Sequence, residues 1–184
     1  MRSLAVALLS ALHQLAIALW LGGMLALGAL AAPAVFGAAK QAGDTHWGTP
    51  LYNFAGAAMG EAFRRYNGLA MAAGLIAAAA GLGYGYLAGL CPIRLRVRAG
   101  LTAAAWAVTA WQALVLYPQM LAVRNSGQMD AFDAMHKTYA SAGHAQALLL
   151  MGVLLLTGYL HFDHTPHGAP ESAASSTAEP LPVP

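Results

Sequence analysis

The stretch LHQLAIALWLGGMLALGALAAPAVF, residues 12–36, is the clearest indication of the fold class. It carries no charged side chain, and it is longer than the roughly 20 apolar residues that take a helix across about 30 Å of hydrocarbon. Hydrophobic residues make up 59% of the 184-residue chain and charged residues only 9%, whereas charged residues approach about a quarter of a soluble domain. The sequence therefore predicts an integral membrane protein.

Four uncharged runs of this kind follow one another along the chain, so we expect an all-α fold. Residues 1–163 are predicted to form an integral membrane bundle of four transmembrane helices, and Pro33 is expected to mark where the first helix leaves the membrane. The predicted spans are residues 4–32, 67–90, 99–123 and 138–160. Residues 164–184 are rich in Pro, Ser and Ala, and we expect them to be a disordered tail.

Between the first two spans, residues 50–66 have the pattern of an amphipathic helix. Thr49 and Pro50 suit the cap and the first position of a helix. Apolar residues then recur at helical spacing, and Asn53 and Glu61 fall on the opposite face. The favoured interpretation is an interfacial amphipathic helix lying along the membrane surface. The alternative is that these residues lead directly into the second span.

Basic residues predict the orientation of the bundle. Arg94, Arg96 and Arg98 crowd the connection between the second and third spans, and Arg2 begins the first. Lysine and arginine concentrate in short cytoplasmic loops, which places both termini in the cytoplasm. The formal net charge of +2 is too small for a basic face that binds nucleic acid. The expected surroundings are the lipid bilayer.

The second span carries small residues at four-residue spacing, which allow another helix backbone to approach closely. They are Ala73, Ala77, Gly81, Gly85 and Gly89. Packing within the bundle is one interpretation of this stripe, and a homodimer interface through Gly81, Gly85 and Gly89 is the other.

Polar residues inside the spans raise the question of function. His13, Trp20 and Met24 share one helix face, which we expect to turn inward because unpartnered polar groups are costly in hydrocarbon. Candidate partners on the third and fourth spans are Gln112, His136, Tyr139, His144 and Gln146. The histidines either make structural hydrogen bonds between helices, or bind heme b or copper or relay protons, since imidazole ligates both metals.

Four motifs together resemble one family of bacterial membrane proteins. They are residues 12–36 quoted above, FRRY at 63–66, LYPQM at 116–120 and FDAMHKTYASAGH at 132–144. This combination resembles the family called domain of unknown function 4149, which is related to animal transmembrane-protein-205-like sequences. The resemblance covers about residues 5–160 and implies a four-span bundle in the bacterial inner membrane.

The residues of this chain that match the family pattern lie within the predicted spans or close to their ends. They are His13, Trp20, Gly22, Gly23, Pro33, Phe36, Arg65, Tyr66, Pro118, Phe132 and His136. Two other families are more faintly similar, namely the copper-resistance D membrane proteins and the four-span bacterial protoporphyrinogen oxidases. Either would imply that His13 is a metal or heme ligand. However, the charged residues that follow the oxidases' first helix are absent, and the methionines form no dense array.

Motifs of soluble enzymes are missing, because the chain has no Gly-rich phosphate loop, GxSxG or HExxH. Our first hypothesis is therefore a non-enzymatic membrane protein with a structural, interaction or small-solute role. The alternative hypothesis is a heme- or copper-binding redox or transport protein that uses His13 with His144 or His136.

Overall fold

The computed structural model describes residues 1–46 and 48–163, with side chains described as far as residue 158. In chain order the elements are α1 (Arg2–Leu25), η1 (Ala26–Ala31), α2 (Ala32–Gln41), α3 (Pro50–Ala88), α4 (Pro92–Trp111), η2 (Gln112–Leu116), α5 (Tyr117–Asn125) and α6 (Met129–Asp163). The predicted tail, residues 164–184, lies outside the described residues.

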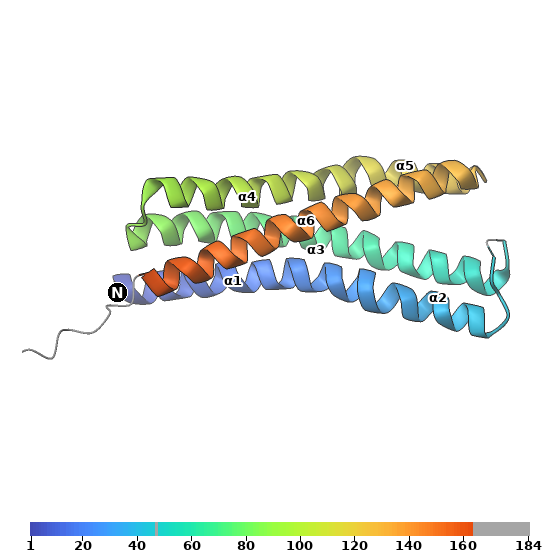
Figure 1. The fold of residues 1–184 in the computed structure, drawn as a ribbon, viewed down its shortest axis with the longest axis horizontal. Helices are drawn as coiled ribbons and strands as arrows, with labels where there is room; N and C mark the ends of the chain where they lie inside the picture. Colours follow the sequence, from blue (N-terminus) through green and yellow to red (C-terminus); the bar gives the residue numbers. More distant parts are fainter. Residues whose placement is uncertain (47, 164–184) are drawn as a thin grey trace, which may run out of the picture.

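These elements make four long antiparallel helices, because α1, η1 and α2 follow one another without a break, as do α4, η2 and α5 (Figure 1). The helices long and apolar enough to cross a membrane are Arg2–Gln41, Pro50–Ala88, Pro92–Asn125 and Met129–Gly158. The predicted all-α fold with four spans is thus confirmed. The N-terminus and the last turns of α6 lie at one end of the bundle, and the loops after α2 and α5 lie at the other (Figure 1).

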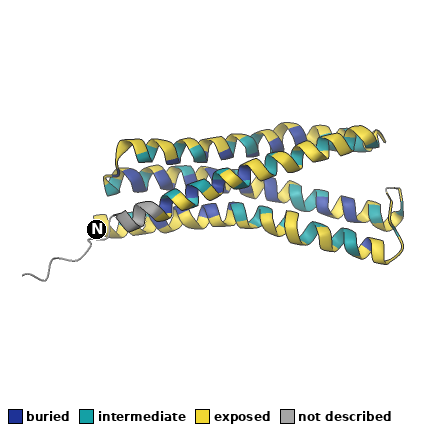
Figure 2. Cartoon of the chain, in the orientation of Figure 1, coloured by how far each residue is buried: buried dark blue, intermediate teal, exposed yellow. Residues whose placement is uncertain are grey.

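The outer surface of the bundle is apolar, as lipid contact requires. Large hydrophobic side chains remain exposed on every long helix, among them Leu15, Leu75, Leu114 and Leu155. Exposed residues cover the outward faces in Figure 2, and buried residues are concentrated along the inward faces. In water such a surface would drive aggregation, so the burial pattern agrees with a membrane protein.

The helices extend beyond the predicted spans. Residues 50–66 and the second span form the single helix α3, so the chain follows the alternative in which the amphipathic segment leads directly into the span. The reason is local, because no proline separates the two parts and Gly68 alone costs a helix only about 1 kcal/mol. Likewise, Arg94, Arg96 and Arg98 lie in the first turns of α4 and not in a connection.

Both internal prolines follow a π-helical segment. Pro33 is the second residue after η1, and Pro118 is the second residue after η2. A proline ring clashes with the carbonyl four residues earlier and offers no N–H, and a local widening to π geometry is one way in which a helix accommodates such a break. The first helix therefore continues through Pro33 to Gln41, and the point at which it leaves the membrane stays a prediction.

Helix α3 forms the centre of the packing. It contacts α1, α2 and α4, while α6 closes the bundle against α4, α5 and α1. Ala73, Ala77, Gly81 and Gly85 are buried within the chain, so this part of the small-residue stripe packs inside the bundle. Gly89, the last member of the stripe, ends α3 with a φ of 68°, a conformation that glycine adopts at helix ends.

Candidate functional site

His13 points into the bundle and is 2% exposed. Its Nδ1 lies 2.8 Å from the carbonyl oxygen of Ala77 in α3. Because a carbonyl oxygen only accepts hydrogen bonds, Nδ1 carries the hydrogen. The other ring nitrogen, Nε2, is buried and makes no hydrogen bond within the described part of the chain. The geometry thus leaves Nε2 available to a further partner.

Glycine at position 81 permits this close approach. A β-carbon built on Gly81 would lie 2.9 Å from His13 Nδ1 and 3.7 Å from Arg98 Nη2. Real β-carbons essentially never approach other atoms as closely as 2.9 Å, so a side chain here would displace the imidazole. The His13 and Arg98 side chains therefore converge on the same glycine from two different helices.

Arg98 is the most unexpected member of this site, because it is 1% exposed. It donates a hydrogen bond to the Gly81 carbonyl, and its guanidinium carbon lies 5.2 Å from the centre of the buried Tyr84 ring. Nη1 makes no hydrogen bond among the described residues, and none of the carboxylates described there forms an ion pair with Arg98. A buried guanidinium without a carboxylate is costly in a membrane.

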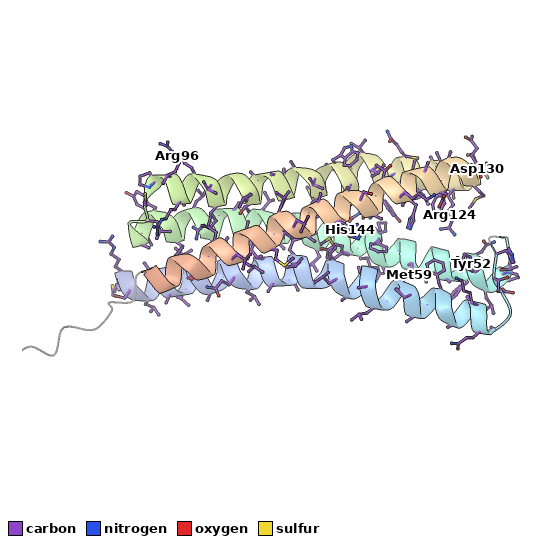
Figure 3. All side chains as sticks on the ribbon, in the orientation of Figure 1. Tyr52, Met59, Arg96, Arg124, Asp130 and His144 are labelled. Carbon is purple, nitrogen blue, oxygen red and sulfur yellow. The ribbon has the colours of Figure 1, made fainter. Side chains whose placement is uncertain are left out.

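Arg98 was expected in the connection between the second and third spans, and its buried place on α4 corrects that expectation. The signal that could have revealed it is helical periodicity. Arg98, Thr102, Ala105 and Thr109 recur at spacings of four and three, and all four are buried on one face of α4. Arg96, two residues earlier, is exposed and labelled near the α4 start (Figure 3).

Nearer the middle of the bundle, three of the family-motif residues meet. The Tyr66 hydroxyl in α3 donates a hydrogen bond of 2.5 Å to the Trp20 carbonyl in α1. A β-carbon on Gly23 would lie 2.7 Å from Tyr66 Cε2, whereas one on Gly22 would have nothing within 4 Å. The second glycine of the motif thus admits the tyrosine ring, and the first has no such role.

A chain of polar contacts joins α3 to α6 and η2. The Tyr139 hydroxyl donates to Asn67 Oδ1 at 3.0 Å, and Gln112 Nε2 donates to the Tyr139 carbonyl at 2.9 Å. Gln112 and Tyr139 were expected to be partners of His13, but in the structure they bond to each other and to α3. Gln146 is buried. These contacts hold the third and fourth spans together.

The other two predicted histidines do not reach His13. His144 lies exposed near the middle of α6 (Figure 3), and His136 is exposed and stacks on Phe132 with ring centres 6.0 Å apart. No hydrogen bond or ring contact in the described residues joins either one to His13. That part of the chain also contains no group of three His, Cys, Asp or Glu side chains placed to hold a metal.

Two remaining motif residues lie near the loop end of the bundle. Phe36 in α2 packs against Tyr52 with ring centres 5.1 Å apart. Arg65 donates to Glu61 at 2.7 Å, and Arg64 donates to the same carboxylate at 2.7 Å. These residues therefore stabilise the α2 to α3 region and take no part in the His13 site.

The comparison with protein families agrees with this architecture. The model of a domain of unknown function, DUF4149, matches residues 15–129. The chain belongs to the DUF4149 family. Comparisons with curated proteins and with solved structures gave no match.

The DUF4149 match begins at residue 15, within α1, and ends at Met129, the first residue of α6. It includes Trp20, Gly23, Tyr66 and Arg98, whereas His13 lies just before it. The family match and the four long apolar helices together agree with a multi-pass membrane protein.

Proposed function

We propose that this DUF4149 protein is a non-enzymatic membrane protein that binds a small anion between α1, α3 and α4. The observation that carries this proposal is Arg98, a buried guanidinium with no carboxylate partner in the described part of the chain. An isolated charge inside a bilayer is expensive and generally functional. An anion would neutralise it where the protein offers only a carbonyl and a tyrosine ring.

The atoms without hydrogen bonds indicate where the anion would sit. Arg98 Nη1 and His13 Nε2 are both buried and unbonded, and the other nitrogens of the same two groups, Arg98 Nη2 and His13 Nδ1, lie close to Gly81. Arg98 supplies N–H donors directly. His13 Nε2 becomes a donor only after gaining a proton, because Nδ1 already holds the hydrogen that faces Ala77. We therefore expect anion binding to take up a proton.

The test is anion-specific stabilisation of the purified protein in a neutral detergent. Chloride replaces gluconate at constant ionic strength, and the unfolding temperature is followed at several pH values. In wild type we expect chloride to cause a saturable rise in the unfolding temperature, and this rise should be larger at lower pH. The rise should be absent in Arg98→Gln and reduced in His13→Gln. Arg96→Gln is the matched control, since it removes an exposed arginine from the same helix.

Two results would overturn the proposal. One is a chloride response in Arg98→Gln equal to that of Arg96→Gln, and the other is the absence of any chloride-specific effect in wild type. If Arg98→Gln does not fold, the chloride response of His13→Gln is compared with that of Arg96→Gln instead. A folded wild-type protein without any anion response would indicate that the polar residues only hold the helices together, which is the structural role.

The heme or copper alternative rests on one feature of this site. Metal-bound histidines commonly donate their second ring N–H to a carbonyl, as His13 does to Ala77. However, the Arg98 guanidinium, which lies with His13 at Gly81, repels a cation bound to this ring. An absorption spectrum and metal analysis test this directly. A Soret band or stoichiometric copper that is present in wild type and lost in His13→Ala would support the heme or copper alternative in place of the anion proposal.

We further propose that the protein lies in the bacterial inner membrane with the α3 to α4 connection and both termini in the cytoplasm. Arg2, Arg94 and Arg96 support this orientation. Cys91 is the single cysteine of the chain, is exposed and lies in that connection. A membrane-impermeant maleimide should label it in inverted vesicles and not in intact spheroplasts. Labelling in spheroplasts would reverse the orientation.

A further inference from the structure

The loop end of the bundle contains an open cleft between the first half of α3 and α5. Its volume is about 880 Å³, and its lining also includes Gly48 of the preceding loop and Met129 at the start of α6. The first half of α3 and α5, which line this cleft, lie at the opposite end of the bundle from the α3 to α4 connection (Figure 1). The cleft is therefore separate from the His13 and Arg98 site, and a ligand bound in it is independent of the anion proposed there.

The lining of the cleft includes two arginines and one carboxylate. They are Arg64, Arg124 and Glu61. Glu61 accepts two hydrogen bonds from Arg64, at 2.7 and 2.8 Å, while Arg124 donates to the Asn53 carbonyl at 3.3 Å. Two guanidinium groups and one carboxylate leave a net positive charge in the lining, which suits a phosphate.

The lining of the cleft also has an apolar part. Phe54 and Leu121 belong to it and are 72% and 40% exposed. Tyr117 lines the cleft as well, and its hydroxyl donates to the Gly60 carbonyl at 2.8 Å. In a bundle that spans the membrane, this end lies near the level of the lipid headgroups. A ligand that fills the cleft therefore needs an anionic head beside an apolar chain.

We propose that the cleft binds one anionic phospholipid of the surrounding leaflet, with its phosphate at Arg64 and Arg124 and an acyl chain along Phe54 and Leu121. Basic pockets between transmembrane helices bind such headgroups. The volume of the cleft falls within the range of about 300 to 1,000 Å³ found for specific ligand sites. A zwitterionic lipid lacks the net negative charge that would favour binding beside the two arginines.

The experiment measures lipid binding to the full-length protein, delipidated in a neutral detergent. Phosphatidylglycerol is titrated while native mass spectrometry counts bound lipids, and phosphatidylcholine and inorganic phosphate are titrated in parallel. We expect one saturable phosphatidylglycerol site. Arg124→Gln should weaken it about fivefold, the factor for one arginine at a membrane surface. Lys40→Gln is the control, because Lys40 is exposed and does not line the cleft.

A second pair of variants keeps the test independent of charge. Ala57 lines the cleft, whereas its neighbour Ala58 is exposed and does not. Ala57→Phe should block phosphatidylglycerol binding, and Ala58→Phe should leave it within about twofold of wild type. Equal binding of phosphatidylcholine, or equal effects of Ala57→Phe and Ala58→Phe, would overturn the proposal. Saturation by inorganic phosphate that displaces the lipid would instead indicate a site for free phosphate.

Discussion

His13 of α1 and Ala77 of α3 are joined by a contact of 2.8 Å between the imidazole Nδ1 and the carbonyl oxygen. The bond ties a side chain of the first span to the backbone of the second. It can form because position 81, one turn further along α3, has no side chain.

Gly81→Ala should therefore destabilise the bundle. The new methyl group would lie 2.9 Å from His13 Nδ1, and overpacking of this kind costs about 1 to 3 kcal/mol. Gly68→Ala in the same helix is the control, since a β-carbon there has nothing within 4 Å and alanine favours a helix by up to about 1 kcal/mol. Denaturant unfolding in detergent micelles measures the free energy of unfolding of the two variants. Equal stability of Gly81→Ala and Gly68→Ala would contradict the close contact at Gly81.

The two adjacent glycines of the WLGG motif should respond differently to alanine. Gly23→Ala would place a methyl group 2.7 Å from the Tyr66 ring, which cannot swing away without losing its hydrogen bond to Trp20. We expect a loss of about 1 to 3 kcal/mol in the free energy of unfolding. Gly22→Ala should have almost no destabilising effect. A similar loss for both would argue against this contact.

Tyr66→Phe should lower stability by a smaller amount. It removes the hydroxyl that donates to the Trp20 carbonyl while keeping the ring, and one hydrogen bond between membrane helices contributes about 0.6 to 2 kcal/mol. Tyr86→Phe is the control, because Tyr86 is exposed on the same helix. Thermal unfolding of the two variants side by side decides the point, and no difference between them would mean that the Tyr66 bond contributes nothing.

The histidines should separate into one structural and one dispensable position. His13→Ala removes a buried side chain and its hydrogen bond to α3, for which we expect a loss of about 1 to 3 kcal/mol. His144→Ala changes an exposed residue of α6, so stability should stay near that of wild type. Equal destabilisation by both substitutions would support the His13 and His144 pair that the sequence suggests.

Much of the architecture could be predicted from local patterns. Residues 12–36 alone contain more uncharged apolar sequence than one span needs, and the four long helices and the DUF4149 family were both found as expected. The π-helical segments were not predicted. Pro33 and Pro118 each follow one of them, and both helices continue past the proline.

Only part of the candidate site could be predicted from the sequence. The inward face of His13, Trp20 and Met24 follows from helical spacing, and His13 and Trp20 are indeed fully buried, with Met24 partly so. Arg98 was missed, because charge density near a predicted loop outweighed its place on the buried face of α4. The cleft at Arg64 and Arg124 joins segments far apart along the chain, so no spacing rule could reveal it.

The amino-acid sequence alone was enough to identify a four-span, all-α membrane protein of the DUF4149 family with a polar face inside its first helix. Hydropathy and helix formation depend on residues close together along the chain, which is why that much could be deduced. The assembled bundle was needed to establish that His13 meets Ala77, Gly81 and Arg98, and not His144. The rotation and depth of each helix depend on how small residues of one helix fit the side chains of the next, and that fit exists only once the helices have packed together.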